Sequence, residues 1–454
     1  MGNQSSGTDV VVIGAGSIGI AVAYYLCQRQ PNLRVVLVDD AAPMALTSAQ
    51  SGENYRNWWP HPIMKSFMDR SIELMEEISR NTNNRIQLTT RGYLLATRKS
   101  AEGDLLDNLC DTFIDTDALR RHTSTTSYQR ALQAPSGVPA DGVDIVESGQ
   151  TIAECYPRFD PSLKTLFHIR RGGMLSAQQM GSVMLELIRK NGGRIIRGSV
   201  TELAANGRFT VTITNDNQTS SIQTDVVVNA AGPFVNSIAN MLSIELPVIN
   251  VLQQKIAFED TQKSIERNLP FAIDLDEQTI NWSADERDAL TADASLEFLT
   301  NTMPGSIHCR PEGGDHGNWI KLGWAYNQKS SMPSRTPSLD AFFPEIVLRG
   351  ATRLQPRLEH YLNRFPRNFS HYGGYYTMTE ENWPLIGETE IPGFYTAAAL
   401  SGFGTMAACG TGELIASAII GNTLPGYASD LSGKRHQNKT LMAEINALQS
   451  RGIL

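Results

Sequence analysis

The sequence predicts an α/β protein that combines a helix-covered parallel sheet with a second, α+β part whose sheet is mainly antiparallel. Two observations predict this arrangement. Between residues 10 and 39, a strand, a glycine-rich turn, a helix and a second strand follow one another. In the second half of the chain, Leu252–Asp260 and Trp319–Tyr326 alternate between apolar and polar residues in the manner of antiparallel strands.

The N-terminal segment has the strongest pattern in the chain. Val10–Ile13 is a short run of β-branched residues, as expected for a strand buried on both faces of a parallel sheet. Ile18 to Leu26 is apolar and suited to a helix, and Val35–Val38 repeats the pattern of the first strand. This order of elements predicts a Rossmann-like unit.

Three glycines and an acid point to a ligand for this unit. Gly14, Gly16 and Gly19 have the spacing G-x-G-x-x-G, which allows a tight turn, close approach of a pyrophosphate and close packing of the helix. Asp39 follows the second strand, where a carboxylate can bind a ribose. We predict a dinucleotide site, rather than a glycine-rich turn without a ligand, formed by Gly14, Gly16, Ser17, Ile18, Gly19, Asp39 and Asp40. The motif alone does not distinguish FAD from NAD.

Composition narrows the class of protein. The 454 residues suffice for two or three domains of about 150 residues each. The formal net charge of −8 argues against nucleic acid or an anionic membrane as the main partner. No run of 18 apolar residues is present. The five cysteines lack C-x-x-C spacing, which predicts reduced thiols, no metal site and a cytoplasmic protein.

Further elements can be placed along the chain. We expect a helix over Pro62–Arg80, a strand over Gly92–Thr97, a helix opened by Gly172–Leu175 and running to Lys190, a strand over Gly192–Gly198, a hairpin-like pair formed by Phe209–Ile213 and Ser221–Val228, and a strand over Tyr372–Met378 preceded by a helix after Pro356. Residues 100–160 are polar and turn-rich, and residues 261–293 are acidic and irregular.

A second glycine-rich junction lies near the C-terminus. Gly393–Ala399 reads as a strand of small residues, Leu400–Gly404 follows it, and a helix is expected from about Ala407 to Ile420. A flavin fixed along its length can use both junctions, with its pyrophosphate at the first helix and its ring near the last. An NAD enzyme has no need of the second junction.

Four separated motifs together resemble a known family. They are Gly14–Asp39, Val226–Pro233 (VVVNAAGP), Trp383–Gly387 (WPLIG) and Ser401–Gly412 (SGFGTMAACGTG), and they lie in this order between Asp9 and about Pro425. The chain thereby resembles the D-amino-acid-oxidase-type (DAO) flavoprotein family, in its sarcosine oxidase/glycine oxidase branch. The resemblance implies FAD as the cofactor.

The resemblance also implies a domain division and further FAD contacts. The FAD-binding domain would comprise residues 8–90, 165–240 and 374–430, the substrate domain residues 91–164 and 241–373, and a C-terminal tail residues 431–454. Beyond the first unit, FAD would be held by Ser48, Ser51, Gly52, Ala231, Gly232, Ser401, Gly402, Phe403, Gly404, Thr405 and Met406.

The sequence departs from the family pattern at three places. Gly374 stands near where sarcosine oxidases carry a flavin-linked cysteine, and residues 47–53 contain no histidine, so non-covalent FAD is expected. Met406 replaces a lysine that helps to hold a substrate carboxylate, and Ala325 replaces a histidine near the substrate. A small substrate of the sarcosine type is therefore not expected, whereas oxidation of an amine is.

The resemblance gives Lys321 a catalytic role, and side-chain chemistry gives one to Arg56. Lys321 falls where the family places a lysine facing the flavin, and there its charge would favour oxygen as the electron acceptor; the alternative is a strand lysine that reaches solvent. Arg56 is the best candidate for binding a substrate carboxylate, because guanidinium binds carboxylate bidentately. Trp58, Trp59, Tyr375 and Met406 would line a larger, apolar pocket, unless they serve as ordinary core residues.

These observations predict an FAD-dependent oxidoreductase that converts the C–N bond of an amine or amino acid to an imine. The substrate is expected to be secondary or bulky, and molecular oxygen is expected to be reduced to hydrogen peroxide. One alternative is a dehydrogenase of the same fold that passes electrons to a carrier protein or quinone. Another is an assembly factor or non-catalytic subunit that retains the flavin.

Overall fold

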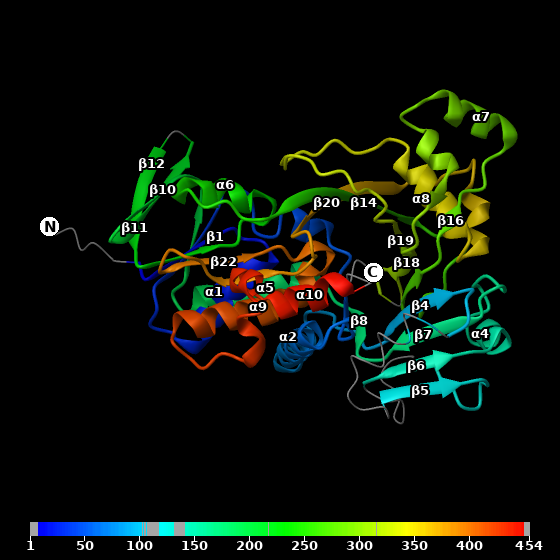
Figure 1. Ribbon diagram of the computed structural model, residues 1–454, viewed down its shortest axis with the longest axis horizontal. Coiled ribbons are helices and arrows are strands. Elements are labelled where there is room, and N and C mark those ends of the chain that lie inside the picture. Colours follow the sequence, from blue (N-terminus) through cyan, green and yellow to red (C-terminus); the bar gives the residue numbers. More distant parts are fainter. Residues whose placement is uncertain are drawn as a thin grey trace.

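A computed structural model of the protein describes residues 8–101, 103, 106, 118–130, 141–216, 218–314 and 316–448. The fold is mixed α/β, as predicted, and it has two lobes (Figure 1). One lobe contains a six-stranded sheet with helices, and the other is built on a nine-stranded sheet. Within the described ranges, no helix is long and apolar enough to cross a membrane.

The six-stranded sheet has the order β21-β22-β13-β1-β2-β9. Its strands are β1 (Val10–Ile13), β2 (Val35–Asp39), β9 (Arg194–Arg197), β13 (Val226–Asn229), β21 (Leu385–Glu388) and β22 (Phe394–Ala398). All neighbouring pairs are parallel except β21 and β22. The carboxyl ends of β1, β2, β13 and β22 therefore meet at one edge, which is where parallel sheets bind ligands.

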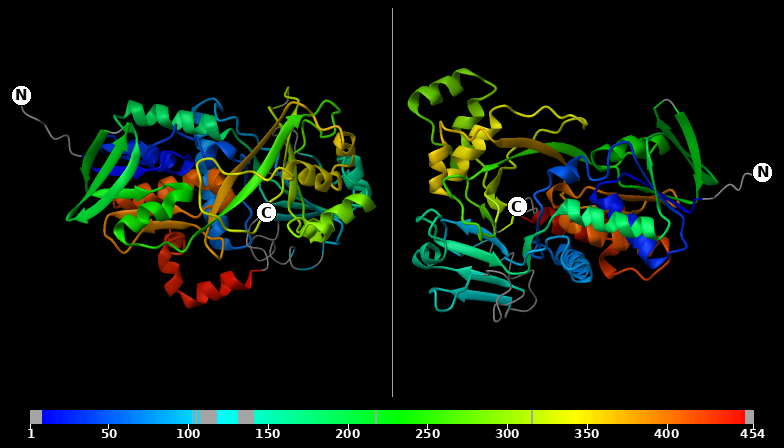
Figure 2. Two further views of the ribbon diagram at one scale, coloured as in Figure 1. Left: turned by 90° about the horizontal axis from the view of Figure 1, so that it is seen from above. Right: turned by 180° about the vertical axis from the view of Figure 1, so that it is seen from behind.

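Four helices that the sequence predicts belong to the lobe that contains this sheet. They are α1 (Ser17–Arg29), α2 (Pro62–Asn81), α5 (Ala177–Lys190) and α9 (Gly404–Ile419). Helices α1 and α9 cross closely, because a Cβ atom added at Gly412 would lie 2.6 Å from the backbone of Ala21. Seen from behind, α5 lies beside α1 (Figure 2), and Asn191 at its end donates a hydrogen bond of 2.8 Å to the carbonyl of Cys27.

The glycines at residues 172 and 173 do not open α5, contrary to the sequence prediction. Gly172–Met174 forms strand β8, which pairs with β3 (Asn54–Arg56). The helix begins at Ala177, because the side chain of Ser176 accepts a hydrogen bond from the amide of Gln179 and caps it. Position 173 needs a glycine for a different reason: a Cβ atom there would lie 1.9 Å from the carbonyl oxygen of Thr89.

A small antiparallel sheet packs against the six-stranded sheet. It consists of β10 (Ser199–Asn206), β11 (Arg208–Asn215) and β12 (Gln218–Thr224). The predicted hairpin partner Ser221–Val228 is therefore wrong as a single strand, because it spans the end of β12 and most of β13. The chain changes sheets at Asp225, where β12 ends and the buried parallel strand starts.

The nine-stranded sheet has the order β20-β14-β19-β18-β15-β4-β7-β6-β5. Its strands are β4 (Tyr93–Thr97), β5 (Leu119–His122), β6 (Val143–Val146), β7 (Thr165–Ile169), β14 (Ile249–Glu259), β15 (Phe271–Asp274), β18 (Ile307–Glu312), β19 (Trp319–Gly323) and β20 (Phe369–Met378). The predicted antiparallel pairing of β14 with β19 is confirmed. In Figure 1, β14 and β20 extend from the first lobe into the second.

Two segments without predicted strands contribute to this sheet. Residues 100–160 supply β5 and β6, and residues 261–293 supply β15. Strands β6 and β15 have only four residues each and are buried along their whole length, so they show no alternation that would identify them. The remaining short strands are β16 (Gln278–Thr279) and β17 (Thr302–Met303), which pair with each other.

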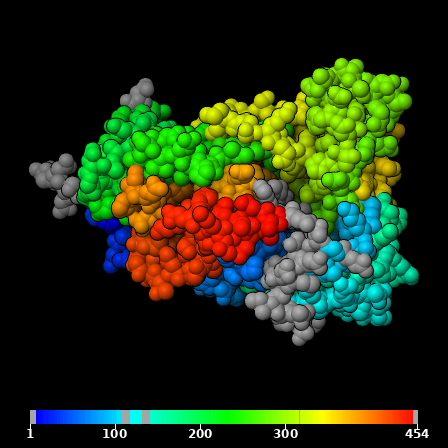
Figure 3. Space-filling model, in the orientation of Figure 1, coloured from blue at the N-terminus to red at the C-terminus, as the bar shows by residue number. Residues whose placement is uncertain are grey.

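Further helices complete both lobes and the chain end. They are α4 (Gly149–Cys155), α6 (Val235–Ala239), α7 (Ala284–Ala292), α8 (Phe343–Thr352) and α10 (Lys439–Ala447), with a 3₁₀ turn at Pro356–Tyr361 where a helix was predicted. The predicted tail packs on the first lobe (Figure 3), since buried Arg435 pairs with Glu381 at 2.5 Å. The domain boundaries stay a prediction. Strand β7 begins at residue 165, where a segment of the predicted FAD-binding domain begins, and β20 spans the predicted boundary at residue 374, yet both strands pair within the nine-stranded sheet.

Candidate FAD and substrate site

The turn between β1 and α1 is built so that only glycine fits at two positions. Gly14 has a φ of 106°, and a Cβ atom there would lie 2.2 Å from the carbonyl oxygen of Ala230. A Cβ atom at Gly19 would lie 1.8 Å from the carbonyl oxygen of Gly14. Both glycines therefore hold α1 close to the ends of β1 and β13.

Gly16 has a different role, because it lies at the start of α1 with an ordinary extended backbone, φ −76°. As the N-cap residue, Gly16 has no side chain with which to cap the helix. Ser17 donates its backbone N–H to Ser48 Oγ at 2.9 Å, and a Cβ atom at Gly16 would lie 3.0 Å from the same Oγ atom. A helix start beside a small, Cβ-free surface fits a pyrophosphate, which both FAD and NAD contain.

The two acids after β2 lie beside this turn. Asp39 accepts hydrogen bonds from the backbone N–H groups of Ala15 (2.6 Å) and Ala41 (2.8 Å), and its burial raises its pKa. Asp40 accepts a hydrogen bond from Ser199 at 2.9 Å and pairs with Arg335. Asp39 thus braces the glycine turn, and a carboxylate with two oxygens can still accept a ribose hydroxyl.

The second glycine-rich junction is strained. Ala399 and Ser401, between β22 and α9, have φ values of 58° and 44°, which side-chain-bearing residues rarely adopt. Such conformations cost about 1–3 kcal/mol each and concentrate at functional sites. Helix α9 begins at Gly404 without a side-chain cap. Thr405 in its first turn lies 2.7 Å from the hydroxyl of Ser51, so this junction contacts the segment after Ser48.

A cavity lies between this junction and the nine-stranded sheet. Its walls come from the segment before and within β3, from the facing strands of the large sheet, and from the start of α9. They are formed by Ser51, Gly52, Glu53, Asn54, Arg56, Trp59, Tyr93, Lys255, Phe271, Ser306, His308, Ala325, Tyr376, Ser401, Gly402, Phe403, Thr405 and Met406. Seven predicted FAD-binding positions line it, namely Ser51, Gly52, Ser401, Gly402, Phe403, Thr405 and Met406.

The other predicted FAD residues surround the edge of the six-stranded sheet. Gly14, Gly16, Ser17, Ile18, Gly19, Asp39, Asp40 and Ser48 gather at the ends of β1 and β2, Ala231 and Gly232 follow β13, and Gly404 starts α9. The fold therefore gathers the predicted residues into two groups, one at the glycine turn and one around the cavity.

Arg56 is buried in the cavity wall, with 1% of its surface exposed. Its Nη1 donates to the hydroxyl of Tyr93 at 3.0 Å, and its Nε donates to the carbonyl of Trp58 at 3.3 Å. The guanidinium carbon lies 4.9 Å from the ring centroids of both Trp59 and Tyr93. Two aromatic rings thus fix the plane of the guanidinium, which prepares it for a planar anion.

The predicted pocket residues divide into two pairs. Trp59 and Met406 line the cavity, whereas Trp58 is fully buried in the core of the large sheet. Tyr375 lies on the opposite side of β20, where its hydroxyl accepts a hydrogen bond of 3.0 Å from the amide of Ser334. The next residue, Tyr376, lines the cavity instead, because successive side chains of a strand point to opposite faces.

Lys321 does not line the cavity, although its side chain lies on the same face of the large sheet as Lys255 and His308. Its Nζ atom is 3.1 Å from Glu312 Oε2, 3.8 Å from Glu53 Oε2 and 3.4 Å from the carbonyl of Ser51, to which it donates. Burial, together with the charge of Arg310, lowers the pKa of Lys321. Its ammonium therefore approaches the Ser51 segment from the sheet side, within a cluster of two cations and two carboxylates.

Several cavity residues were not predicted as site residues, among them Lys255, His308 and Tyr376. Lys255 and Tyr376 lie on strands that the sequence predicted, whereas His308 lies on β18, which it did not. Lys255 on β14 is 6% exposed, and burial with the charges of Lys321 and Arg310 lowers its pKa to about 8. Burial also lowers the pKa of His308 to about 3 and raises that of Tyr376 to about 12. The alternation of residues along β14 shows which side chains share a face with Lys255. It could have identified Lys255 as a cavity residue only if the face of β14 that lines the cavity had been known.

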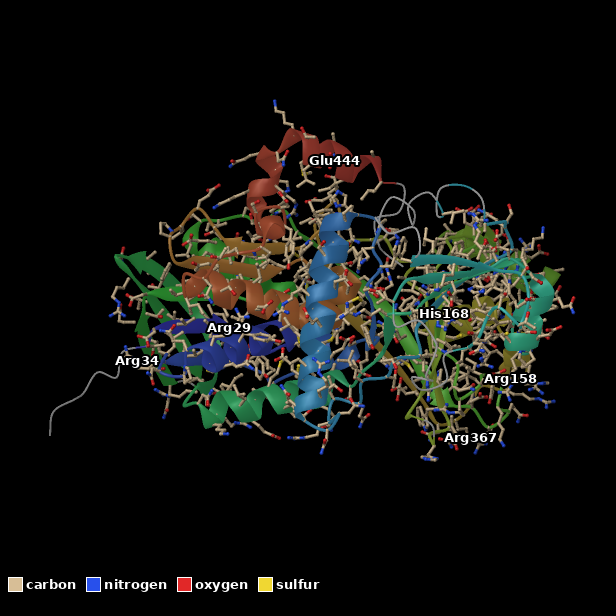
Figure 4. The ribbon with its side chains drawn as sticks, turned by 90° about the horizontal axis from the view of Figure 1, so that it is seen from below. Arg29, Arg34, Arg158, His168, Arg367 and Glu444 are labelled. Carbon is tan, nitrogen blue, oxygen red and sulfur yellow. The ribbon has the colours of Figure 1, made fainter. Side chains whose placement is uncertain are left out.

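His168 has a structural role. His168 lies in the second lobe, away from α1 and α9 (Figure 4). It is fully buried, with ring nitrogens 2.9 Å from the hydroxyl of Tyr128 and 3.0 Å from the carbonyl of Arg91. Burial lowers the pKa of His168 to about 3, so it stays neutral and joins strands rather than binding a ligand.

Comparison with known proteins agrees with this geometry. The sequence model of the FAD dependent oxidoreductase family, DAO, matches residues 9–418, so the chain belongs to this family and its cofactor is FAD. Monomeric sarcosine oxidase from Bacillus sp. (strain B-0618) is 22% identical over 274 residues, which are 59% of this chain and 62% of that protein. The match thus spans less than two thirds of that relative's length.

Two solved structures show the same fold. L-proline dehydrogenase from P. horikoshii has a TM-score of 0.67 at 19% identity, over 95% of this chain and 98% of that chain. Glycine oxidase from Geobacillus kaustophilus has a TM-score of 0.68 at 16% identity, over 94% and 98%. The predicted family resemblance and fold class are therefore confirmed.

Proposed function

We propose that the protein oxidises the C–N bond of an amine or amino acid, secondary or bulky, to an imine. The observation that carries the proposal is the buried guanidinium of Arg56, held between Trp59 and Tyr93 in a cavity that also contains the start of α9. A fixed guanidinium inside an aromatic cavity binds the carboxylate of an amino acid and orients its α-carbon.

Each wall of the cavity would contribute one requirement of this reaction. Bound FAD, held by the two glycine-rich junctions, would accept a hydride equivalent from the α-carbon. Arg56 would fix the carboxylate, and the rings of Trp59, Tyr93 and Phe271 would exclude water and accommodate a bulky side chain. Substitution of the family's lysine by Met406 enlarges the apolar part of this wall, which supports a substrate larger than sarcosine.

His308 is suited to position the amine. Its Nδ1 lies 3.2 Å from the carbonyl of Ser306, to which it donates in the neutral tautomer, and this leaves Nε2 as an acceptor. Burial keeps the ring neutral, since its pKa is lowered to about 3. Nε2 can therefore hold an N–H of the substrate without competing for its proton.

We further propose that FAD is bound non-covalently and that molecular oxygen is the electron acceptor, which gives hydrogen peroxide. Gly374 offers no thiol, and a Cβ atom there would lie 3.2 Å from Gln50, beside the segment that lacks a histidine. Lys321 supports oxygen, because a buried cation near the ring would stabilise negative charge arriving on oxygen. A dehydrogenase with a carrier or quinone is the alternative, and the fold is common to both classes.

We also expect a cytoplasmic protein whose partners are a small amine or amino acid and oxygen, not nucleic acid or membrane. The four described cysteines Cys27, Cys155, Cys309 and Cys409 are free thiols, which supports a reducing compartment.

The proposal is tested by mixing purified FAD-loaded protein anaerobically with a panel of primary and secondary amino acids and amines. Loss of the flavin absorbance, with release of the 2-oxo acid or aldehyde, is expected for at least one bulky or N-substituted member. Admission of oxygen should restore the absorbance and give stoichiometric peroxide. Arg56→Met should raise KM for carboxylate substrates by at least about tenfold, the scale of one lost charged hydrogen bond.

Intact FAD binding without turnover of any member would contradict the proposal and favour a non-catalytic flavoprotein. Reoxidation by a quinone or carrier protein but not by oxygen would leave amine oxidation standing and replace the oxidase by a dehydrogenase.

A further inference from the structure

Lys255 lies in the middle of the cavity wall made by the large sheet. On β14 it is directly opposite Gly323 of β19, and Gly323 is directly opposite His308 of β18. Directly opposite residues of antiparallel strands have side chains on the same face, and Gly323 contributes no side chain between its neighbours. Lys255 and His308 are therefore adjacent cavity residues, and both line it.

The Lys255 ammonium has no acidic partner in the part of the chain that the structure describes. Among the described residues, no carboxylate lies within 4.0 Å of it, whereas the neighbouring Lys321 pairs with Glu312 and Glu53. Its closest aromatic partner is Tyr376, whose ring centroid is 5.7 Å away. The titratable or charged groups that face it from the neighbouring strands are Lys321 on β19, His308 and Arg310 on β18, and Tyr372 and Tyr376 on β20.

A buried ammonium among cations and tyrosines is expensive unless a ligand supplies the negative charge. The acid that lines the cavity, Glu53, is already engaged. Its Oε1 accepts a hydrogen bond of 2.9 Å from the amide of Ala177, and its Oε2 accepts one of 3.2 Å from Arg310. The described residues that line the cavity thus include two permanent or potential cations, Arg56 and Lys255, and one acid, Glu53, which is held by other groups.

The two cations are separated by an uncharged wall. Arg56 contacts Tyr93. The ring of Tyr93 packs at a tilt against Phe271 with centroids 4.7 Å apart, and Phe271 packs at a tilt against His308 with centroids 5.0 Å apart. Tyr93, Phe271 and His308 lie on the adjacent strands β4, β15 and β18, and β14 with Lys255 lies beyond β19. One cation is therefore at each end of this wall.

We propose that Lys255 is a specificity-determining residue that binds a second carboxylate of the substrate, so that the enzyme acts on amino acids with an acidic side chain or an acidic N-substituent. This rests on the proposed function, because Arg56 must hold the first carboxylate. The uncharged wall then accommodates the carbon chain between the two acids, and the second acid supplies the negative charge at Lys255. A monocarboxylate leaves Lys255 buried without a counter-charge.

The test uses unreactive acids, so that it does not depend on turnover. Calorimetric and flavin-absorbance titrations of the FAD-loaded protein at pH 7 compare the dicarboxylates succinate, glutarate and adipate with the monocarboxylates butyrate, pentanoate and hexanoate. The best dicarboxylate is expected to bind at least tenfold more tightly than the monocarboxylate of the same length. Equal affinities in the wild-type protein would overturn the proposal without any variant.

Variants then assign the preference to Lys255. Lys255→Met retains the length of the side chain and removes the charge, so the preference should fall below threefold, whereas Lys255→Arg should keep it. Lys329→Met is the matched control on an exposed lysine and should change nothing. An unchanged preference in Lys255→Met would overturn the proposal, and so would a loss of FAD affinity with the preference intact, since Lys255 would then serve the cofactor.

The two proposals can fail separately. If no amine reduces the flavin but the dicarboxylate preference depends on Lys255, amine oxidation is wrong and the binding site stands. If amines reduce the flavin and the preference is absent or does not involve Lys255, the reverse holds.

Discussion

Gly16→Val separates the fold of the glycine turn from its ligand. Gly16 has a φ of −76° and ψ of −177°, which valine adopts without strain. The added Cβ atom meets only Ser48 Oγ at 3.0 Å, a small side chain that can rotate. The protein should therefore fold, while the branched side chain occupies the surface that the pyrophosphate needs at the start of α1.

The size of the effect follows from the contacts that would be lost. Displacing the pyrophosphate would remove the charge-assisted hydrogen bonds that it would receive at the start of α1, and the loss of two such bonds costs about 1.5–3 kcal/mol each. A loss of at least about 3 kcal/mol weakens the Kd for FAD by about a hundredfold or more. Titration of apoprotein with FAD, followed by quenching of flavin fluorescence, measures it. The Tm of the wild-type apoprotein should rise when FAD is added, whereas the Tm of the Gly16→Val apoprotein should not.

Two further variants control the result. Gly433→Ala adds a methyl group where nothing lies within 4 Å and should leave Kd and Tm unchanged. Gly19→Val places its Cβ atom 1.8 Å from a backbone carbonyl and should lower the Tm of the apoprotein itself. A folded Gly16→Val protein that binds FAD with the wild-type Kd would refute the assignment of this turn to the pyrophosphate.

Three other outcomes are expected. Lys321→Met should slow reoxidation of the reduced protein by oxygen at least about a hundredfold, the scale of one preorganised electrostatic group, with a modest effect on flavin reduction; rapid mixing with oxygenated buffer measures it, and a wild-type rate would make Lys321 an ordinary strand lysine. Acid or heat precipitation should release the flavin as intact FAD, because Gly374 offers no thiol, and flavin retained in the pellet would contradict this. The dicarboxylate preference should decline as pH rises through about 8, the pKa of Lys255, because only the protonated ammonium binds the second acid; a preference constant from pH 6 to pH 10 would exclude Lys255 as its origin.

The parts of the fold that the sequence predicts well are those with a strong local pattern. The β1–α1–β2 unit is predicted because short β-branched runs flank glycines at a diagnostic spacing, and the structure places each element within a few residues of the expectation. The β14–β19 pair is predicted because both strands alternate. Motif order along the chain then identified the family, which no single motif could do.

The errors have local causes. Strands β6 and β15 are short and buried on both faces, so neither alternates. Gly172 and Gly173 read as a helix start, although they form a strand that packs on Thr89, a contact distant in sequence.

The site residues that were missed depend on orientation. Tyr375 and Tyr376 differ only in which face of β20 they occupy, and sequence alone does not fix that face. Lys255 gains its importance from Gly323 and His308 on two other strands, whose register no local pattern reveals. The charge of Lys321 proved to be shared with Glu312 and Glu53, which lie 9 and 268 residues away along the chain.

The most direct measurement of amine oxidation is the effect of deuterium at the substrate α-carbon on the anaerobic rate of flavin bleaching. The best substrate from the amine panel is mixed rapidly with FAD-loaded protein in its protiated and α-deuterated forms. If the C–H bond beside nitrogen breaks as the flavin is reduced, the deuterated substrate should bleach it several times more slowly. Equal rates, with a chemical step shown to be rate-limiting by single-turnover product analysis, would contradict the proposed reaction.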